Sequence, residues 1–293
     1  MNGSDQIRPH PSETGIVRNP RLPFTVYRSP FTLLKPFTLF SVLTPLLLPA
    51  CGGLSPLRGH AVVGRDAYLL FVGETADGQS DLFGVRADGG PVFQITYTPV
   101  VEAAPVLSPD GGTVAFLRAA TIGDKKPGRV WVLNLLSGAE RELQLRRGAA
   151  APTALGWSED GSAIYVRADT TVYRFVAPPA SGEPRIVTDG ERSRAESSLE
   201  VLVGQPPFGS VVPCGSDLCV LSEQSAPAPF ASNAHDPVRW GPDSVGFVSG
   251  PDLIVRPVGP GHQRRLEWSG APSGVRGLTF FGGESVNTVN GKR

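Results

Sequence analysis

The sequence predicts an all-β fold, and three observations support this prediction. From residue 59 onward, short apolar runs rich in Val, Ile, Phe and Tyr alternate with turn-forming residues. The 35 Gly and 29 Pro residues are spread between these runs and are not gathered in one tract. Helical spacing of apolar residues over ten or more positions appears nowhere in this region. We therefore expect many short strands joined by turns.

The strands recur in a loose repeat of strand, Asp-Gly-type turn, strand, loop, strand, loop, strand. Each copy reads as one four-stranded antiparallel sheet. The turn positions, near residues 64, 110, 160, 206, 243 and 283, are separated by about 37 to 50 residues, which is the period of propeller blades. Clear copies begin at Ala104, Ala154 and Pro237, weaker ones at Tyr68 and Gly209, and a partial one at Gly277. The fold class is therefore a β-propeller of four-stranded antiparallel blades.

The number of blades depends on how the last copy is completed. Five copies are reasonably complete, and the sixth stops after two strands. A six-bladed ring, which we expect, needs strands from the segment around His60–Val63. Five blades or an incompletely closed ring are the alternatives. Closure matters because it removes exposed sheet edges.

Three pentapeptides occupy the first turn of the three clear copies. They are Leu107-Ser108-Pro109-Asp110-Gly111, Trp157-Ser158-Glu159-Asp160-Gly161 and Trp240-Gly241-Pro242-Asp243-Ser244. They resemble the Trp-Ser-Pro-Asp-Gly signature of TolB-like, WD-repeat-like propellers, and the resemblance covers nearly all of the chain after residue 59. In such a turn Pro restricts φ, Asp bonds its own backbone and Gly accepts a positive φ. We expect these residues to be structural, with Trp or Leu wedged between blades.

The amino-terminal part reads as a leader that ends at a cysteine. Arg28 and Lys35 flank the start of an apolar run over 36–50, which is shorter than a membrane span and is interrupted by prolines. We expect a leader over 1–50, with its signal peptide at about 26–50, a lipidated linker over 51–58 and a propeller domain over 59–293. Leu48-Pro49-Ala50-Cys51-Gly52-Gly53 resembles the lipobox of bacterial lipoproteins. The resemblance implies that Cys51 is acylated; the alternative is a cysteine that follows an ordinary signal peptide.

The sequence offers no recognisable catalytic or metal-binding motif. His60, His235 and His262 lack metal-ligand spacing, and the acidic turn residues lack the spacing of a calcium loop. Serine hydrolase, zinc protease and P-loop motifs do not occur. We therefore expect no cofactor, no metal and no enzymatic activity. Cys214 and Cys219 flank a predicted hairpin turn, where a disulfide or a pair of free buried cysteines can form.

Charge and composition limit the partners. The 27 basic and 27 acidic residues balance, so no positive field attracts nucleic acid. Our leading hypothesis is a monomeric, non-enzymatic protein-binding or scaffolding module of the cell envelope. It would be lipid-anchored at a membrane, facing the periplasm or the cell surface if the cell has two membranes. The alternative is a glycan or another small ligand in the propeller channel, and a hydrolase or lyase ranks last.

Overall fold

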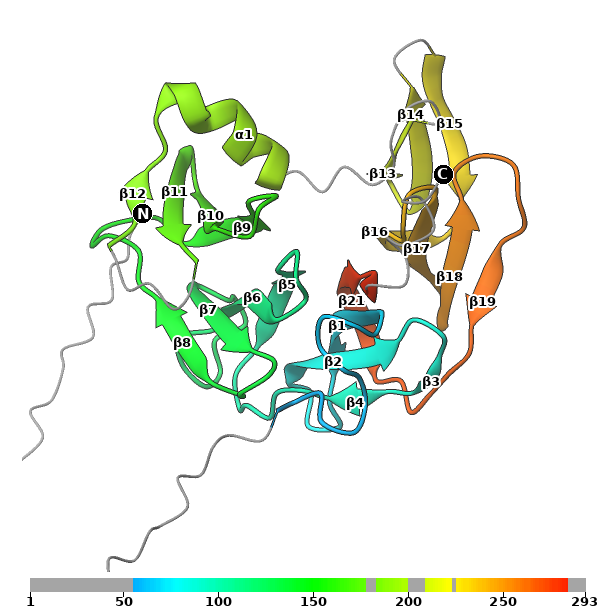
Figure 1. Cartoon of the computed structure of the whole chain (residues 1–293), viewed down its shortest axis with the longest axis horizontal. Helices are drawn as coiled ribbons and strands as arrows, with labels where there is room; N and C mark the ends of the chain where they lie inside the picture. The colour runs from blue at the N-terminus through cyan, green and yellow to red at the C-terminus, as the bar shows by residue number, and fades with distance from the viewer. Residues whose placement is uncertain (1–54, 178–182, 200–208, 223–224, 284–293) are drawn as a thin grey trace, which may run out of the picture. The chain divides into compact units, whose positions relative to one another are not determined.

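The computed structural model describes residues 55–177, 183–199, 209–222 and 225–283 (Figure 1). The chain divides into two compact units, 1–48 and 49–293, and every described residue belongs to the second unit. The predicted signal peptide and Cys51 lie outside the described residues.

Five antiparallel sheets make up the described fold. The first sheet has the order β21-β1-β2-β4, with β21 at Ser273–Phe281, β1 at Tyr68–Glu74, β2 at Ser80–Arg86 and β4 at Phe93–Gln94. The second contains β5 (Glu102–Leu107), β6 (Thr113–Arg118), β7 (Arg129–Asn134) and β8 (Glu140–Leu143). The third contains β9 (Pro152–Trp157), β10 (Ala163–Ala168), β11 (Thr171–Val176) and β12 (Arg185–Ile186). The fourth contains β13 (Ser210–Cys214), β14 (Asp217–Ser222) and β15 (Ser225–Ala231). The fifth contains β16 (Ala234–Arg239), β17 (Ser244–Ser249), β18 (Asp252–Pro257) and β19 (Arg264–Leu266).

These sheets confirm the predicted fold class. Each is an antiparallel meander, and four of the five have four strands. The described residues form five such sheets, which corresponds to the five-bladed alternative and not to the six blades that we expected. A short parallel pair, β3 (Gly90–Pro91) with β20 (Trp268–Ser269), also links the first-sheet segment to the chain that follows the fifth sheet.

The first sheet combines strands from the two ends of the propeller sequence. β21 pairs with β1 in a register that runs from Tyr68 opposite Phe281 to Glu74 opposite Ser273, and Figure 1 shows the red strand beside the blue one. The copy that begins at Gly277 therefore completes the first sheet and does not start a new one. The segment around His60–Val63, from which we expected a strand, forms turns. Pairing with β21 covers an edge of β1 that would otherwise be exposed.

In the described part of the chain, one helix accompanies the strands of this all-β fold. α1 spans Asp189–Leu199 and packs against β9 and β10 (Figure 1). Only Ala195 and Leu199 of this helix are buried, and most of its other side chains are charged or polar. Two buried apolar residues among 11 form no periodic stripe, so the spacing of apolar residues does not indicate this helix.

Apolar clusters lie between neighbouring sheets. Leu70 and Val72 of β1 pack with Phe116 of the second sheet, whereas Leu69 and Phe71 pack with residues of the fifth sheet. This alternation follows from the two-residue period of a strand. Because both faces of β1 are covered, its sequence is a continuous apolar run. Each buried large side chain contributes roughly 1.5–3 kcal/mol, so these clusters are the main source of cohesion between sheets.

Candidate functional site

The first two repeat turns have nearly the same hydrogen bonds. In one, Asp110 Oδ1 accepts from Ser108 Oγ at 2.5 Å and from Gly112 N at 2.9 Å. In the other, Asp160 Oδ1 accepts from Ser158 Oγ at 2.7 Å and from Ser162 N at 3.0 Å. The hydroxyl of Ser158 and the N–H of Ser162 lower the pKa of Asp160 to about 2. These aspartates are occupied in closing the turns.

Glycine follows each of these aspartates for a conformational reason. Gly111 and Gly161 both have a φ of 70°, which side chains rarely tolerate. Pro109 and Pro242 lie exposed within their turns. The third turn is one residue shorter, because Trp240 N donates to Ser244 O whereas Ser158 N donates to Ala163 O. Its positive φ falls on Gly241, ahead of Pro242 and Asp243.

The residues that lead into the turns lie between sheets. Leu107 belongs to the cluster between the first and second sheets, and Trp157 to the cluster between the second and third. Trp157 Nε1 also donates to Val106 O of β5 at 2.9 Å. Trp240 stacks on Phe280 of β21, with ring centroids 4.2 Å apart. These positions match the wedge role that the sequence indicated.

The turns surround a cleft of about 560 Å³, which we call the inner cleft. It is lined by residues at the ends of β5, β9, β16 and β21 and by Ser198 of α1. Phe280 and Phe281 contribute partly exposed aromatic surface, and Glu159 and Arg239 contribute exposed charges of opposite sign. The Arg239 side chain donates from Nε to Gly241 O at 3.2 Å, and within the described residues its terminal nitrogens have no partner, so they can bind a ligand. The cleft therefore combines apolar and charged groups.

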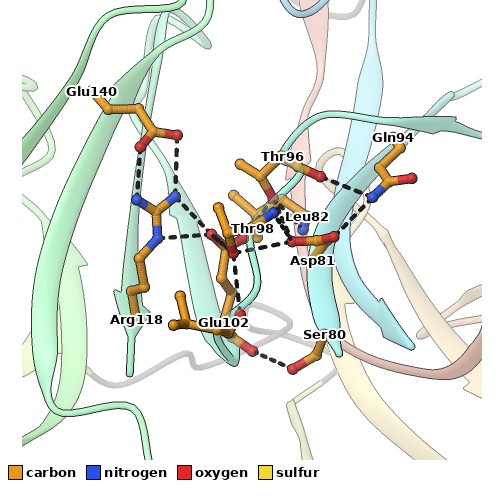
Figure 2. Close-up of polar contacts among 10 residues, drawn as sticks. Ser80, Asp81, Leu82, Gln94, Thr96, Thr98, Glu102, Arg118 and Glu140 are labelled. Carbon is orange, nitrogen blue, oxygen red and sulfur yellow. Dashed lines mark hydrogen bonds and ion pairs between the residues drawn. The ribbon is translucent and has the colours of Figure 1, made fainter. Parts of the chain in front are cut away.

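A second polar assembly joins the first two sheets (Figure 2). Arg118 of β6 contacts Glu102 Oε1 through Nε at 2.9 Å and through Nη2 at 2.7 Å, and its Nη1 lies 2.7 Å from Glu140 Oε2. Thr96 donates to Glu102 Oε2 at 2.6 Å. Thr98 Oγ1 lies 3.3 Å from both Asp81 Oδ1 and Glu102 Oε1. We call these residues the junction network.

Burial controls the charge of the junction network. Asp81 is 3% exposed and Glu102 is fully buried. Loss of water raises the pKa of both carboxyls, and hydrogen bonds from Thr98 to Asp81 and from Thr96 to Glu102 oppose the rise only in part. Burial also acts to lower the pKa of Arg118, but Glu140 and Glu102 outweigh it and the pKa is raised. The network thus holds a charged arginine against carboxyls that retain protons more readily than usual.

The junction network has perturbed carboxyls but lacks the access that a catalytic site needs. Asp81 and Glu102 are at most 3% exposed, so a substrate cannot reach them without separation of the sheets. Neither residue lines the inner cleft. The network is best explained as a structural connection between the first and second sheets.

The other predicted residues lie apart from the cleft. Cys214 and Cys219 form a disulfide across the β13–β14 hairpin, with their Cα atoms 5.9 Å apart. His60 stacks on Phe93, and His235 Nδ1 lies 2.7 Å from Asp236 Oδ2. In the part of the chain that the structure describes, no cluster of three potential metal ligands occurs. Among the same residues no helix has the length and apolar character to cross a bilayer.

Comparison with known proteins identifies the fold. No protein-family model matches the chain, and no curated protein is similar to it in sequence. Among solved structures, TolB from Acinetobacter baumannii matches with a TM-score of 0.51 at 12% identity, covering 76% of this chain and 68% of that chain. The chain has a TolB-like β-propeller fold.

Two further structures are similar with lower scores. A putative TolB from Agrobacterium tumefaciens is 12% identical over 69% of each chain, with a TM-score of 0.30. The β-propeller domain of the Trilobed protease from Pyrococcus furiosus is 15% identical over 68% of this chain and 52% of that one, with a TM-score of 0.28. At such identities the likeness to TolB concerns the fold alone.

Sequence reasoning placed the turns of this TolB-like propeller but missed the junction network. One signal was present: Glu102 stands at the start of a mostly apolar strand, where a charge needs a buried partner. The partner is Arg118, the last residue of β6, which lies directly opposite Glu102 in the β5–β6 pair. Asp81 and Thr96 come from the preceding copy, and only the packing of two sheets brings them to the same place.

Proposed function

We propose that the protein is an envelope-anchored module that binds a partner protein in the inner cleft and catalyses no reaction. The observation that carries this proposal is the convergence of four strand ends and α1 on one cleft of about 560 Å³. Its volume lies within the roughly 300–1,000 Å³ that is typical of ligand sites. A TolB-like fold supplies the scaffold, and the use of the site has to be inferred from its residues.

The lining of the inner cleft favours a peptide segment as the ligand. Phe280 and Phe281 give partly exposed apolar surface for a side chain of the partner, while Glu159 and Arg239 offer one charge of each sign. Aromatic and arginine residues of this kind contribute most of the energy at protein interfaces. A neutral sugar would leave both charges unpaired, so a polypeptide with its own charges fits better.

Anchoring through Cys51 would hold this cleft near a membrane. Each acyl CH₂ buried in the bilayer contributes roughly 0.8 kcal/mol, so several acyl chains on one cysteine give durable attachment. The proposed location is therefore the cell envelope. The absence of catalytic activity is proposed because the described carboxyls with raised pKa, Asp81 and Glu102, are buried away from the cleft.

Binding in the inner cleft is tested by charge reversal. The full chain and a Glu159→Arg/Arg239→Glu variant are used to capture partners from solubilised envelope membranes, and a glycan array is run in parallel. A protein retained by the wild type and lost by the variant supports the proposal. Asp77→Arg, at an exposed position outside the cleft, is the matched control and should retain the partner. Equal retention by the cleft variant, or binding of glycans alone, contradicts the proposal.

Anchoring is tested separately by metabolic labelling with a fatty acid. Label should appear on the wild type and be missing from Cys51→Ala. Equal labelling of the two proteins would remove the anchor from the proposal and leave the binding site untouched.

A further inference from the structure

A second cleft lies between the last strands of the second and third sheets. Its volume is about 530 Å³, and we call it the basic groove. One wall consists of β8 and the linker after it, and the other contains Phe175 of β11 and the residues just before β12. No residue that lines the inner cleft also lines the basic groove. The groove is therefore a separate surface.

Positive charge in the basic groove is poorly neutralised. Its lining contains three arginines, Arg141, Arg146 and Arg147, and two glutamates, Glu142 and Glu183. Glu142 is already paired with Arg129, at 3.2 Å. Among the described residues, none forms an ion pair or a side-chain hydrogen bond with any of the three arginines. Among the described residues that line the groove, Glu183 is thus the one carboxylate without an ion pair that can offset the three arginines.

The other Arg-Arg pair of the chain provides a contrast. Arg265 forms an ion pair with Asp252 at 2.8 Å, and Arg264 donates to Ala87 O at 3.4 Å and lies over the ring of Trp240. These two side chains therefore have partners within the fold. Arg146 and Arg147 are equally exposed and have none in the described chain. The difference indicates that the arginines of the groove are available to an external anion.

The floor of the groove is apolar and runs beside an open strand edge. Leu143 and Phe175 are buried in the cluster between the second and third sheets, with Leu145 packed against them. β8 ends the strand order of the second sheet, so in the described chain it has β7 on one side and no strand on the other. Arg141 lies two residues from Leu143 and points to the same face of β8. An extended peptide lying in the groove can place the side chains of one face on this floor, while those of its other face reach the long arginine side chains.

We propose that the basic groove binds an extended segment of a partner protein in which acidic and apolar residues alternate. The acidic side chains pair with Arg141, Arg146 and Arg147, and the apolar ones lie on Leu145 and the edges of the floor. Arginine suits this role because its planar group binds a carboxylate through two parallel hydrogen bonds. The surface is independent of the inner cleft, so either site can fail without the other.

The test uses the full chain and a fluorescein-labelled peptide of sequence Glu-Val-Glu-Val-Glu-Val, with Lys-Val-Lys-Val-Lys-Val as its counterpart. Fluorescence anisotropy should show binding of the acidic peptide and none of the basic one. Arg146→Glu/Arg147→Glu should weaken binding by about tenfold or more. Raising the ionic strength from about 0.05 to 0.5 M should also weaken it, because exposed charges are screened.

Two controls make the result specific. Arg264→Glu/Arg265→Glu changes the same number of charges at the paired arginines and should leave binding unchanged. Arg141→Gln, a milder change, should weaken binding in a protein whose thermal unfolding matches the wild type. The proposal is overturned if the acidic peptide does not bind, if the 146/147 variant binds it equally, or if the basic peptide binds as well. Binding of phosphatidylglycerol vesicles in its place, lost in the 146/147 variant, would assign the groove to a lipid surface and reject the peptide.

Discussion

Arg118 and Glu102 form the most deeply buried ion pair among the described residues, with side-chain exposures of 8% and 0%. The guanidinium lies 4.9 Å from the ring centroid of Phe116 and 4.6 Å from that of Trp131, so it is enclosed by aromatic groups as well as by carboxylates. Burying such a pair is costly, but leaving one member alone is costlier. The junction network therefore makes the contact between the first two sheets sensitive to single changes.

Replacing Arg118 with Met should destabilise the protein by about 3–5 kcal/mol, because Glu102 would remain buried without a cation. Glu140→Gln should cost about 1 kcal/mol or less, since Glu140 is 30% exposed and solvent screens its charge. Urea unfolding followed by tryptophan fluorescence measures both. Similar losses in the two variants would mean that burial of the pair does not control its contribution.

The pH dependence of stability should reflect the raised pKa of Asp81 and Glu102. A folded state with raised carboxyl pKa values binds protons more tightly than the unfolded chain. This contribution is fully present below the ordinary values of 3.8 and 4.5, and is lost as the pH rises through the raised values. Asp160 and Glu191 act oppositely: with pKa values near 2, they contribute stability that is lost as the pH falls below the ordinary range.

Asp81→Asn removes the contribution of the raised Asp81 pKa and leaves the contributions of Asp160 and Glu191 in place. As the pH rises from the ordinary aspartate value of 3.8 through the raised value, the free energy of unfolding of the wild type should fall by more than that of Asp81→Asn. Asp160→Asn, an exposed control, should keep the wild-type slope in this range, because its effect belongs to lower pH. Parallel slopes for wild type and Asp81→Asn would show that Asp81 titrates normally.

The packing of α1 depends on a missing side chain at Gly156. A Cβ added there would lie 1.9 Å from Ser198 O of the helix, whereas one added at Gly190 would meet nothing within 4 Å. Gly156→Ala should therefore destabilise the protein by about 1–3 kcal/mol. Gly190→Ala lies in the first turn of the helix and should stabilise it slightly, by about 0.5 kcal/mol or less. Thermal unfolding measures the change in stability of each variant. Equal changes in the two variants would mean that the helix moves freely on β9.

Because Ser198 also lines the inner cleft, the Gly156 change has a functional consequence. Displacement of α1 should weaken partner capture, whereas Gly190→Ala should preserve it. Loss of stability with unchanged capture would exclude α1 from the binding surface.

The sequence predicted what the repeat itself specifies, and it missed what depends on contacts between copies. Turn residues such as Asp110 and Asp160 act within their own hairpins, so local spacing was sufficient to place them. α1 was missed because its apolar contacts are few. Thr188 and Glu191 do have the spacing of a capping box, and Thr188 Oγ1 donates to Glu191 Oε2 at 3.2 Å. The pairing of β21 with β1 joins segments some 200 residues apart, and no local pattern reports such a contact.

A buried hydrogen bond joins β21 to the second sheet. Thr279 of β21 accepts a hydrogen bond from Leu107 N of β5 at 3.0 Å, and both groups are buried. Thr279→Val keeps the shape of the side chain but leaves this N–H unsatisfied, which should cost about 1–3 kcal/mol. Thr113→Val is the matched control. Thr113 is half-buried, and its hydrogen bonds in the described chain are made by its backbone N–H and C=O, so this change should be nearly neutral. Urea midpoints compare the two. If Thr279→Val is as stable as the control, the hydroxyl does not hold the first and second sheets together, and the cohesion at this junction must come from the apolar cluster and from Arg118.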